Sequence, residues 1–182
     1  MKWTKDHLYN GFFLILIAVL STKPGKVFFT RLLAMGPTVI EQSEQKYTGD
    51  MHWELIGLNT PNFRWEQAKG EVVFVNFWAT WCPPCVAELP SIHQLYLVYN
   101  KKVKFVFVNG QSWPEIQGFF KEQNIDLPSF QQGSPTPEIL QTQRIPRTFV
   151  IDRNGNIVID EEGAVNWYSE SFRKLLDELI TQ

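Results

Sequence analysis

Residues 72–90, VVFVNFWATWCPPCVAELP, contain both cysteines of the 182-residue chain, Cys82 and Cys85. The run before them, residues 72–78, is β-branched and aromatic, which predicts a buried central strand. After them, apolar residues recur at steps of three and four, which predicts an amphipathic helix. This apolar stripe is formed by Val86, Leu89, Ile92, Leu95, Tyr96 and Tyr99. The two cysteines are therefore expected where a strand ends and a helix begins.

This placement suits thiol chemistry, because the thiolate is the form of cysteine that attacks a disulfide. A helix N-terminus carries partial positive charge and free N–H groups, which stabilise an anion. Pro83 and Pro84 donate no N–H, but their φ fits the first helical turn, and the amides left to face Cys82 are those of Cys85 and Val86. We predict a dithiol/disulfide site in which the more solvent-near Cys82 attacks and the more buried Cys85 resolves the mixed disulfide.

Other roles for these cysteines are disfavoured by the sequence. A disulfide at this spacing closes a small loop, and the entropic stabilisation it gives shrinks with loop length. A metal site is not expected, since His7, His52 and His93 show no ligand spacing and no second Cys/His pair is present. The chain has no glycine-rich phosphate loop and no nucleophilic serine motif. Its net charge of −2 gives no sign of nucleic-acid binding.

The motif WATWCPPC, residues 78–85, resembles the active site of the thioredoxin superfamily. The Pro-Pro pair and the ELP that follows are most similar to the TlpA/ResA branch, whose members are membrane-tethered bacterial thiol–disulfide oxidoreductases. The resemblance extends from about Trp53 to the C-terminus. It implies a thioredoxin-like α/β fold, with a central mixed β-sheet flanked by helices. It also implies that the redox-active disulfide Cys82–Cys85 serves without any further cofactor.

Three positions outside the cysteine pair match the family pattern. The resemblance implies that Glu88 assists proton transfer, that Pro146 is the cis-proline beside the cysteines and that Pro90 kinks the helix. The alternatives are an ordinary exposed helix glutamate and a trans proline that begins a strand. Asn76 departs from the thioredoxin pattern, which has a buried aspartate there. Asparagine cannot accept the proton of the resolving thiol, so Glu88 or water must do so.

The same resemblance implies a substrate-binding surface around the cysteines. It comprises Trp81, Pro83, Pro84, Ile145 and Pro146. The backbone beside Pro146 is expected to pair with an extended substrate segment, in the manner of an added strand. Trp81 is expected to contact partner proteins, the alternative being that it only caps the core.

The N-terminal region predicts a membrane anchor. Residues 8–20, LYNGFFLILIAVL, carry no charge, and residues 3–22 just reach the roughly 20 residues that cross the hydrocarbon core. We expect an uncleaved signal-anchor over residues 1–22, a juxtamembrane segment and linker over 23–46, and a thioredoxin-like domain over 47–182. The alternatives are a cleaved secretory signal and a helix buried in the domain.

Residues 26–39, KVFFTRLLAMGPTV, are apolar with two basic residues. This composition is typical of a short helix that lies on the membrane surface. Packing on the domain, or continuation of a helix from the membrane, is an equal alternative.

The rest of the chain predicts an alternation of strands and helices. The Asn-Gly pair at 154–155 indicates a tight turn between strands over residues 148–152 and 156–160. The proline-rich stretch 127–145 is expected to be irregular. The remaining patterns predict strands over residues 53–58, 63–65 and 103–109 and helices over 113–124 and 167–180.

These features favour an enzyme: a membrane-anchored thiol–disulfide oxidoreductase that reduces disulfides of extracytoplasmic proteins. Through the resemblance we expect a single-pass monomer in the bacterial cytoplasmic membrane, with its catalytic domain on the periplasmic side. The resemblance also implies a role in cytochrome c maturation and an electron donor in the membrane. The first alternative is an oxidase of the same fold that donates its disulfide. The second is a redox-inactive binding module that presents Trp81 and the Pro146 loop to a partner.

Overall fold

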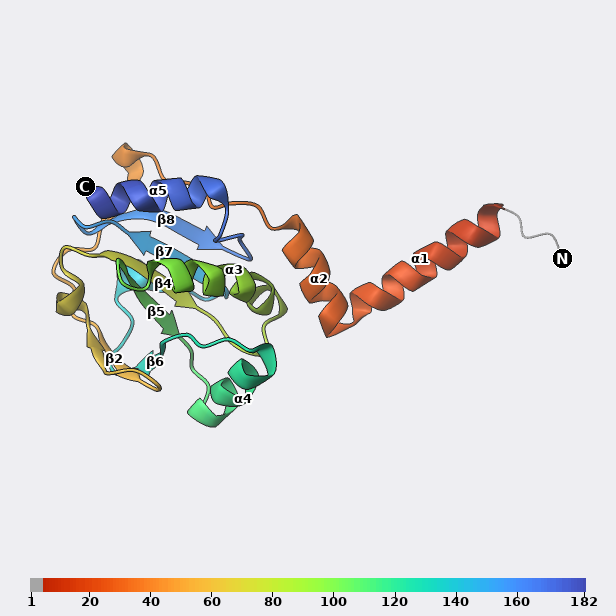
Figure 1. The fold of residues 1–182 in the computed structure, drawn as a ribbon, viewed down its shortest axis with the longest axis horizontal. Helices are drawn as coiled ribbons and strands as arrows, with labels where there is room; N and C mark the ends of the chain where they lie inside the picture. Colours follow the sequence, from red (N-terminus) through yellow and green to blue (C-terminus); the bar gives the residue numbers. More distant parts are fainter. Residues whose placement is uncertain (1–4) are drawn as a thin grey trace.

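The computed structural model describes residues 5–182, with side chains from residue 9 onward. The helices are α1 (Lys5–Ser21), α2 (Lys23–Leu33), η1 (Gln42–Glu44), η2 (Trp65–Ala68), α3 (Pro83–Tyr99), α4 (Trp113–Gln123), η3 (Glu138–Leu140) and α5 (Glu170–Thr181). The strands are β1 (Lys46–Tyr47), β2 (Glu54–Gly57), β3 (Phe63–Arg64), β4 (Val72–Phe77), β5 (Val103–Val108), β6 (Ser129–Gln132), β7 (Arg147–Ile151) and β8 (Asn156–Glu162). Figure 1 shows a rounded domain from which α1 projects.

The strands form one mixed sheet in the order β1-β8-β7-β4-β5-β6-β2-β3. Strand β4 lies in its interior, parallel to β5 and antiparallel to β7. All six residues of β4 are buried, which is the pattern of a strand covered on both faces and confirms the predicted central strand. The expected mixed sheet flanked by helices is therefore present.

Two hydrophobic clusters fill the two sides of this sheet. The first joins Phe74 of β4 to buried residues of α3, α4 and α5, such as Ile92, Ile116 and Phe172. The second contains the alternate β4 residues Val73 and Val75, together with residues of the other strands and of η2 and η3. In Figure 1, α3 lies in front of the central strands, α5 runs along the top of the domain beside β8, and α4 lies at the lower right. Because successive side chains of a strand point to opposite faces, β4 anchors both clusters.

Most of the predicted elements are confirmed, with small shifts at their ends. The hairpin of β7 and β8 turns at Asn154-Gly155, where Gly155 has a φ of 89°. The closing helix begins at Glu170, capped by Ser169, rather than at residue 167. Strand β6 was not predicted: it lies in the stretch expected to be irregular, and it pairs with β2 and β5. Its partners are distant in sequence, so local pattern gave no signal for it.

The expected single transmembrane helix is not confirmed. Within residues 9–182, no one helix combines the length and apolar character that a membrane crossing needs. One pair, Tyr9–Ser21 with Lys23–Leu33, reaches them jointly but is bent by 97°. Residues 1–4 of the predicted anchor lie outside the described part of the chain. The bend is made at Thr22, whose Oγ1 accepts from the amide of Gly25 at 3.1 Å and so caps α2.

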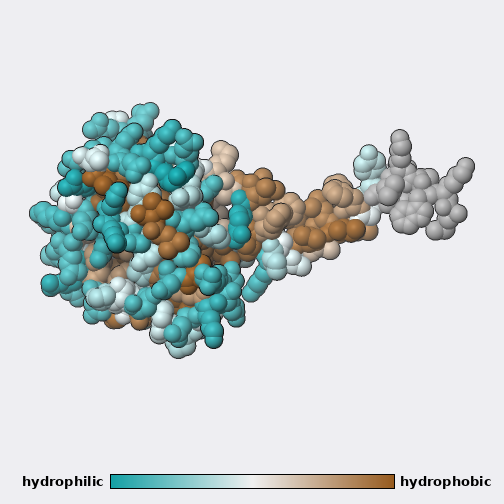
Figure 2. Space-filling view, viewed as in Figure 1, coloured by the Kyte–Doolittle hydropathy of each residue, from teal (hydrophilic) through white to brown (hydrophobic). Residues whose placement is uncertain are grey.

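Helix α2 packs on the domain. Arg31 Nε donates to the carbonyl of Ala87 in α3 at 3.2 Å. After α2, the amide of Asn166 donates to Met35 O, and that of Ile40 donates to Val158 O. Packing on the domain, one of the alternatives for residues 26–39, is thus observed for α2. Figure 2 shows that α1 and α2 nevertheless keep much more apolar surface than the domain beside them.

The role of β4 in the core can be tested at Phe74, which is fully buried against Phe105, Phe107, Trp167 and Phe172. Phe74→Ala removes these contacts and leaves a cavity, so the free energy of unfolding is expected to fall by about 3–5 kcal/mol. Chemical denaturation of the oxidised protein measures this loss.

The matched control is Leu97→Ala in α3, because Leu97 is an exposed apolar residue. Its substitution is expected to change the free energy of unfolding by no more than about 0.5 kcal/mol. Similar losses in the two variants would contradict the assignment of β4 to the centre of the core.

Candidate active site

The two cysteines lie at the junction of β4 and α3, as predicted. Cys82 is the N-cap of α3 and is joined to Cys85 by a disulfide, with their Cα atoms 5.3 Å apart. The amide of Cys85 donates to Cys82 Sγ at 3.3 Å. The amide of Val86 instead donates to the backbone oxygen of Cys82, so only one of the two expected donors reaches the sulfur.

The expected difference in burial between the cysteines is small in this oxidised state. Cys82 is 3% exposed and Cys85 is fully buried. Trp81, directly before the pair, is 62% exposed, so its side chain is available to a partner rather than part of the core. Cys82 remains the sulfur nearer the surface, and its assignment as the attacking thiol stays a prediction.

The loop before β7 brings the second half of the site to the cysteines. The Ile145–Pro146 bond is cis, as the resemblance implied. Ile145 O lies 3.6 Å from Cys82 Sγ, so backbone of this loop contacts the sulfur predicted to attack. Ile145, Pro83 and Pro84 are half-buried and Pro146 is buried. The five predicted substrate-binding residues thus flank Cys82, while their role in binding stays a prediction.

Glu88 is not an exposed helix glutamate: its side chain is buried in α3, one turn after Cys85. One carboxylate oxygen accepts from Asn76 Nδ2 at 2.9 Å. The other accepts from the indole Nε1 of Trp167 at 2.9 Å and from the amide of Val165 at 3.3 Å. Three donors from three different segments therefore hold this carboxyl group in one position.

Burial dominates the protonation of Glu88. Loss of hydration raises its pKa to about 8, although the hydrogen bonds from Trp167, Asn76 and Val165 act in the opposite direction. The carboxyl group is therefore mainly protonated at neutral pH. A group whose pKa is this close to neutrality is suited to exchange a proton during a reaction, which is the property implied for Glu88 by the resemblance.

Asn76 takes part in this network instead of supplying an acid. Its Nδ2 also donates to the hydroxyl of Thr148 in β7 at 2.8 Å, whereas its Oδ1 is buried without a hydrogen-bond partner. Trp167, Val165 and Thr148 were not predicted as site residues. They are far from the cysteines in sequence, and nothing in their local pattern distinguishes them from core residues.

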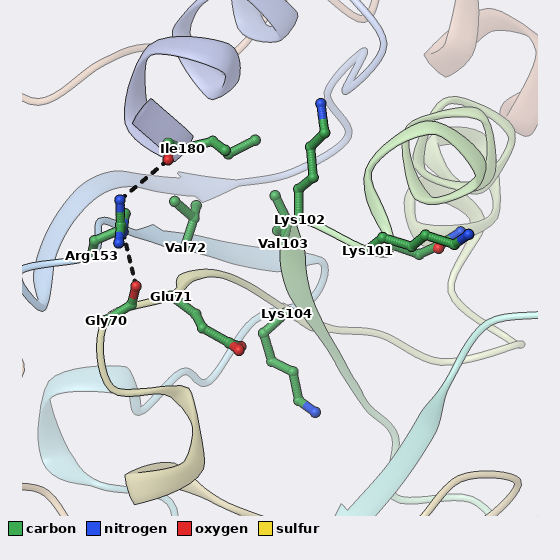
Figure 3. Close-up of a pocket in the computed structure, with 10 residues that line it drawn as sticks. Gly70, Glu71, Val72, Lys101, Lys102, Val103, Lys104, Arg153 and Ile180 are labelled. Carbon is green, nitrogen blue, oxygen red and sulfur yellow. Dashed lines mark hydrogen bonds between the residues drawn. The ribbon is translucent and has the colours of Figure 1, made fainter. Parts of the chain in front are cut away.

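Two other kinds of functional site are relevant in the described part of the chain, a metal site and a basic pocket. Among residues 9–182, whose side chains the structure describes, no group of three His, Cys, Asp or Glu side chains is close enough to hold a metal ion. A basic pocket lies beside Val72 and Val103, at the end of β4 and β5 opposite the cysteines. Figure 3 shows that its lysine amino groups point in different directions, and its Arg153 donates to the carbonyls of Gly70 and Ile180. This pocket is not part of the redox site.

The sheet is mixed, and a CxxC disulfide lies at a helix N-terminus beside a cis-proline. This arrangement defines a thioredoxin-like thiol–disulfide protein. Comparison with known proteins agrees: residues 54–176 match the Redoxin family. ResA, a thiol–disulfide oxidoreductase of Halalkalibacterium halodurans, is 27% identical over 168 residues, which cover 90% of this chain and 92% of that protein. ResA of Bacillus thuringiensis is 30% identical over 124 residues, covering 59% of this chain and 70% of that one.

Solved structures give the same result. A thiol:disulfide interchange protein of the thioredoxin family from Chlorobium tepidum superposes with a TM-score of 0.59 at 26% identity. The match covers 74% of this chain and 97% of that structure. The chain therefore belongs to the Redoxin family, and it is a TlpA/ResA-like thiol–disulfide oxidoreductase of the thioredoxin superfamily. This membership favours the enzyme over the binding-module alternative.

The raised pKa of Glu88 predicts a pH dependence of stability. Between its ordinary value of 4.5 and about 8, the folded protein keeps a proton that the unfolded chain has lost. The free energy of unfolding should therefore fall as pH rises through this range, by at most about 1.4 kcal/mol per pH unit from this group, and level off above it. Denaturation of the oxidised protein between pH 5 and pH 9 measures the slope.

Glu88→Gln replaces the titrating group by a neutral side chain of the same length. The variant should lose most of the slope that the wild-type protein shows over this range. An unchanged slope would mean that Glu88 is ionised in the folded protein, contrary to its burial.

Proposed function

We propose that this protein reduces disulfides of extracytoplasmic proteins through a mixed disulfide with Cys82. The observation that carries the proposal is the contact of Cys82 Sγ with the Ile145–Pro146 loop, next to the exposed Trp81. An extended substrate segment that pairs with the backbone of this loop has its own disulfide close to Cys82.

The exchange proceeds in two steps. The Cys82 thiolate attacks a substrate sulfur, the substrate disulfide breaks, and one substrate thiolate leaves and takes up a proton. Cys85, deprotonated, then attacks Cys82 Sγ, which forms the Cys82–Cys85 disulfide and releases the second substrate thiolate. The dithiol has given two electrons to the substrate, so a separate electron donor must reduce it again. We place this donor in the membrane.

Glu88 is proposed to accept the proton of Cys85 in the second step through its ionised form, which at neutral pH is the minority of a group with a pKa of about 8. It follows Cys85 by one helical turn, and a carboxyl group with a pKa of about 8 both takes up and releases a proton near neutral pH. Asn76 cannot accept that proton itself. It holds Glu88 by its amide, which leaves the carboxyl group as the buried titrating side chain of this network.

The proposed setting is the outer face of the bacterial cytoplasmic membrane, with residues 1–22 as the anchor. Support comes from α1, whose apolar side chains from Phe12 to Ile17 are largely exposed in the structure. Buried apolar surface is favourable, so a helix of this kind is stabilised by lipid around it. We propose that the protein acts in the maturation of cytochrome c, which is a role of TlpA/ResA-like proteins.

The order of attack is tested by trapping the mixed disulfide. Reduced Cys85→Ser should form a mixed disulfide with a protein that carries a disulfide and should then be unable to resolve it. A new band of higher mass is expected on a non-reducing gel, and it should disappear when reductant is added.

Cys82→Ser is the matched variant, with one thiol left at the other position. It is expected to give no such band, since Cys85 is fully buried behind Cys82. A band from Cys82→Ser and none from Cys85→Ser would reverse the assignment of the attacking and resolving thiols.

A further inference from the structure

A groove lies beside the redox disulfide, and α2 forms one of its walls. Its volume is about 400 Å³. Phe28 and Arg31 of α2 line it on one side, Trp81 and Pro83 on another, and Phe119 of α4 on a third. Trp81 and Pro83 are the immediate neighbours of Cys82 in sequence, so the groove is continuous with the predicted substrate-binding surface.

The α2 wall is fixed to the domain rather than free to swing away. The bond from Arg31 Nε to Ala87 O holds it there. Just after the helix, the bond from the Asn166 amide to Met35 O does the same.

The corner between α1 and α2, which sets the direction of α1 relative to α2, is closely packed. Gly25 is buried there, and a Cβ on it would lie 1.9 Å from Val19 O, so no larger residue fits without movement of the backbone. The capping bond from the Gly25 amide to Thr22 Oγ1 holds the same corner. The groove is thus a built feature of this chain.

The chemistry of the lining is apolar and basic. The side chains of Phe28, Trp81 and Phe119 supply aromatic surface, and Lys23 and Arg31 supply positive charge. No Asp or Glu is among the residues that line the groove. A ligand that complements this lining combines an apolar side chain with a carboxylate, because opposite charges across an interface favour the matching partner.

We propose that this groove binds the segment of a substrate protein that flanks its reactive cysteine, and that it selects segments with apolar and acidic side chains. The inference rests on the proposed mixed-disulfide exchange at Cys82. A substrate sulfur bonded to Cys82 places its neighbouring residues beside Trp81 and Pro83, at the opening of the groove. Helix α2 is then a specificity element for the reductase, supplied by the segment that follows the proposed anchor.

The test uses the full chain, reduced and held in detergent micelles, with three disulfide substrates. Two are peptides of the same length and aromatic content, one with acidic and one with basic residues beside the cysteine. The third is hydroxyethyl disulfide, which is neutral and too short to reach the groove while its sulfur is bonded to Cys82. The measured quantity is kcat/KM for the reduction of each substrate.

The wild-type protein is expected to prefer the acidic peptide. Phe28→Ala should lower kcat/KM for that peptide about tenfold, as truncation of an aromatic interface residue does, and leave hydroxyethyl disulfide unchanged. Leu32→Ala is the matched control, because Leu32 is an equally exposed apolar residue of α2 that does not line the groove. It should leave all three rates unchanged.

A charge reversal tests selectivity separately. Lys23→Glu should lower the rate for the acidic peptide and raise that for the basic one, whereas Lys26→Glu, outside the groove, should do neither. Equal rates for both peptides in the wild-type protein would overturn the proposal. So would equal losses in Phe28→Ala and Leu32→Ala, which would mean that lipid or a second copy covers α2. If hydroxyethyl disulfide is not reduced either, the proposed reductase function itself fails.

Discussion

Burial of β4 on both faces is the constraint on which the rest of the structure depends. Its alternate side chains anchor the two hydrophobic clusters, and its position between β5 and β7 fixes where the chain leaves the sheet. Cys82 follows at the N-cap of α3, and Pro146 stands at the start of β7 beside it. The register of β4 with β7 therefore brings the cysteine pair and the cis-proline together, although they lie more than sixty residues apart in the chain.

The same strand also supplies the polar part of the site. Asn76 is its single polar residue, and it bonds Glu88 of α3 and Thr148 of β7 within a fully buried region. Buried polar groups are tolerated where they are hydrogen-bonded, and a carboxyl group in such a place is favoured in its neutral form. The network thus links β4, α3 and β7, and its carboxyl group, Glu88, holds a proton one helical turn from the resolving cysteine.

The sequence predicted those elements whose structure is determined by residues close together in the chain. A continuous β-branched and aromatic run predicted β4, helical periodicity predicted α3, and the Asn-Gly turn predicted the β7–β8 hairpin. The cysteine spacing predicted the redox pair. The cis bond at Pro146 and the importance of Glu88 came only from the resemblance. The contacts of Trp167 and Thr148 with this network, the strand β6 and the docking of α2 depend on tertiary packing between distant segments. Periodicity carries no information about such contacts.

The central claim is that Cys82 and Cys85 act as a reductant. The most direct measurement is the reduction potential of the pair in the full chain, obtained by equilibration with glutathione buffers of known ratio. A value near or below about −230 mV is expected, on the thioredoxin side of the scale, where the dithiol gives electrons to disulfides of higher potential. A value near about −120 mV, typical of a strong oxidant, would contradict the central claim and assign the protein to disulfide donation.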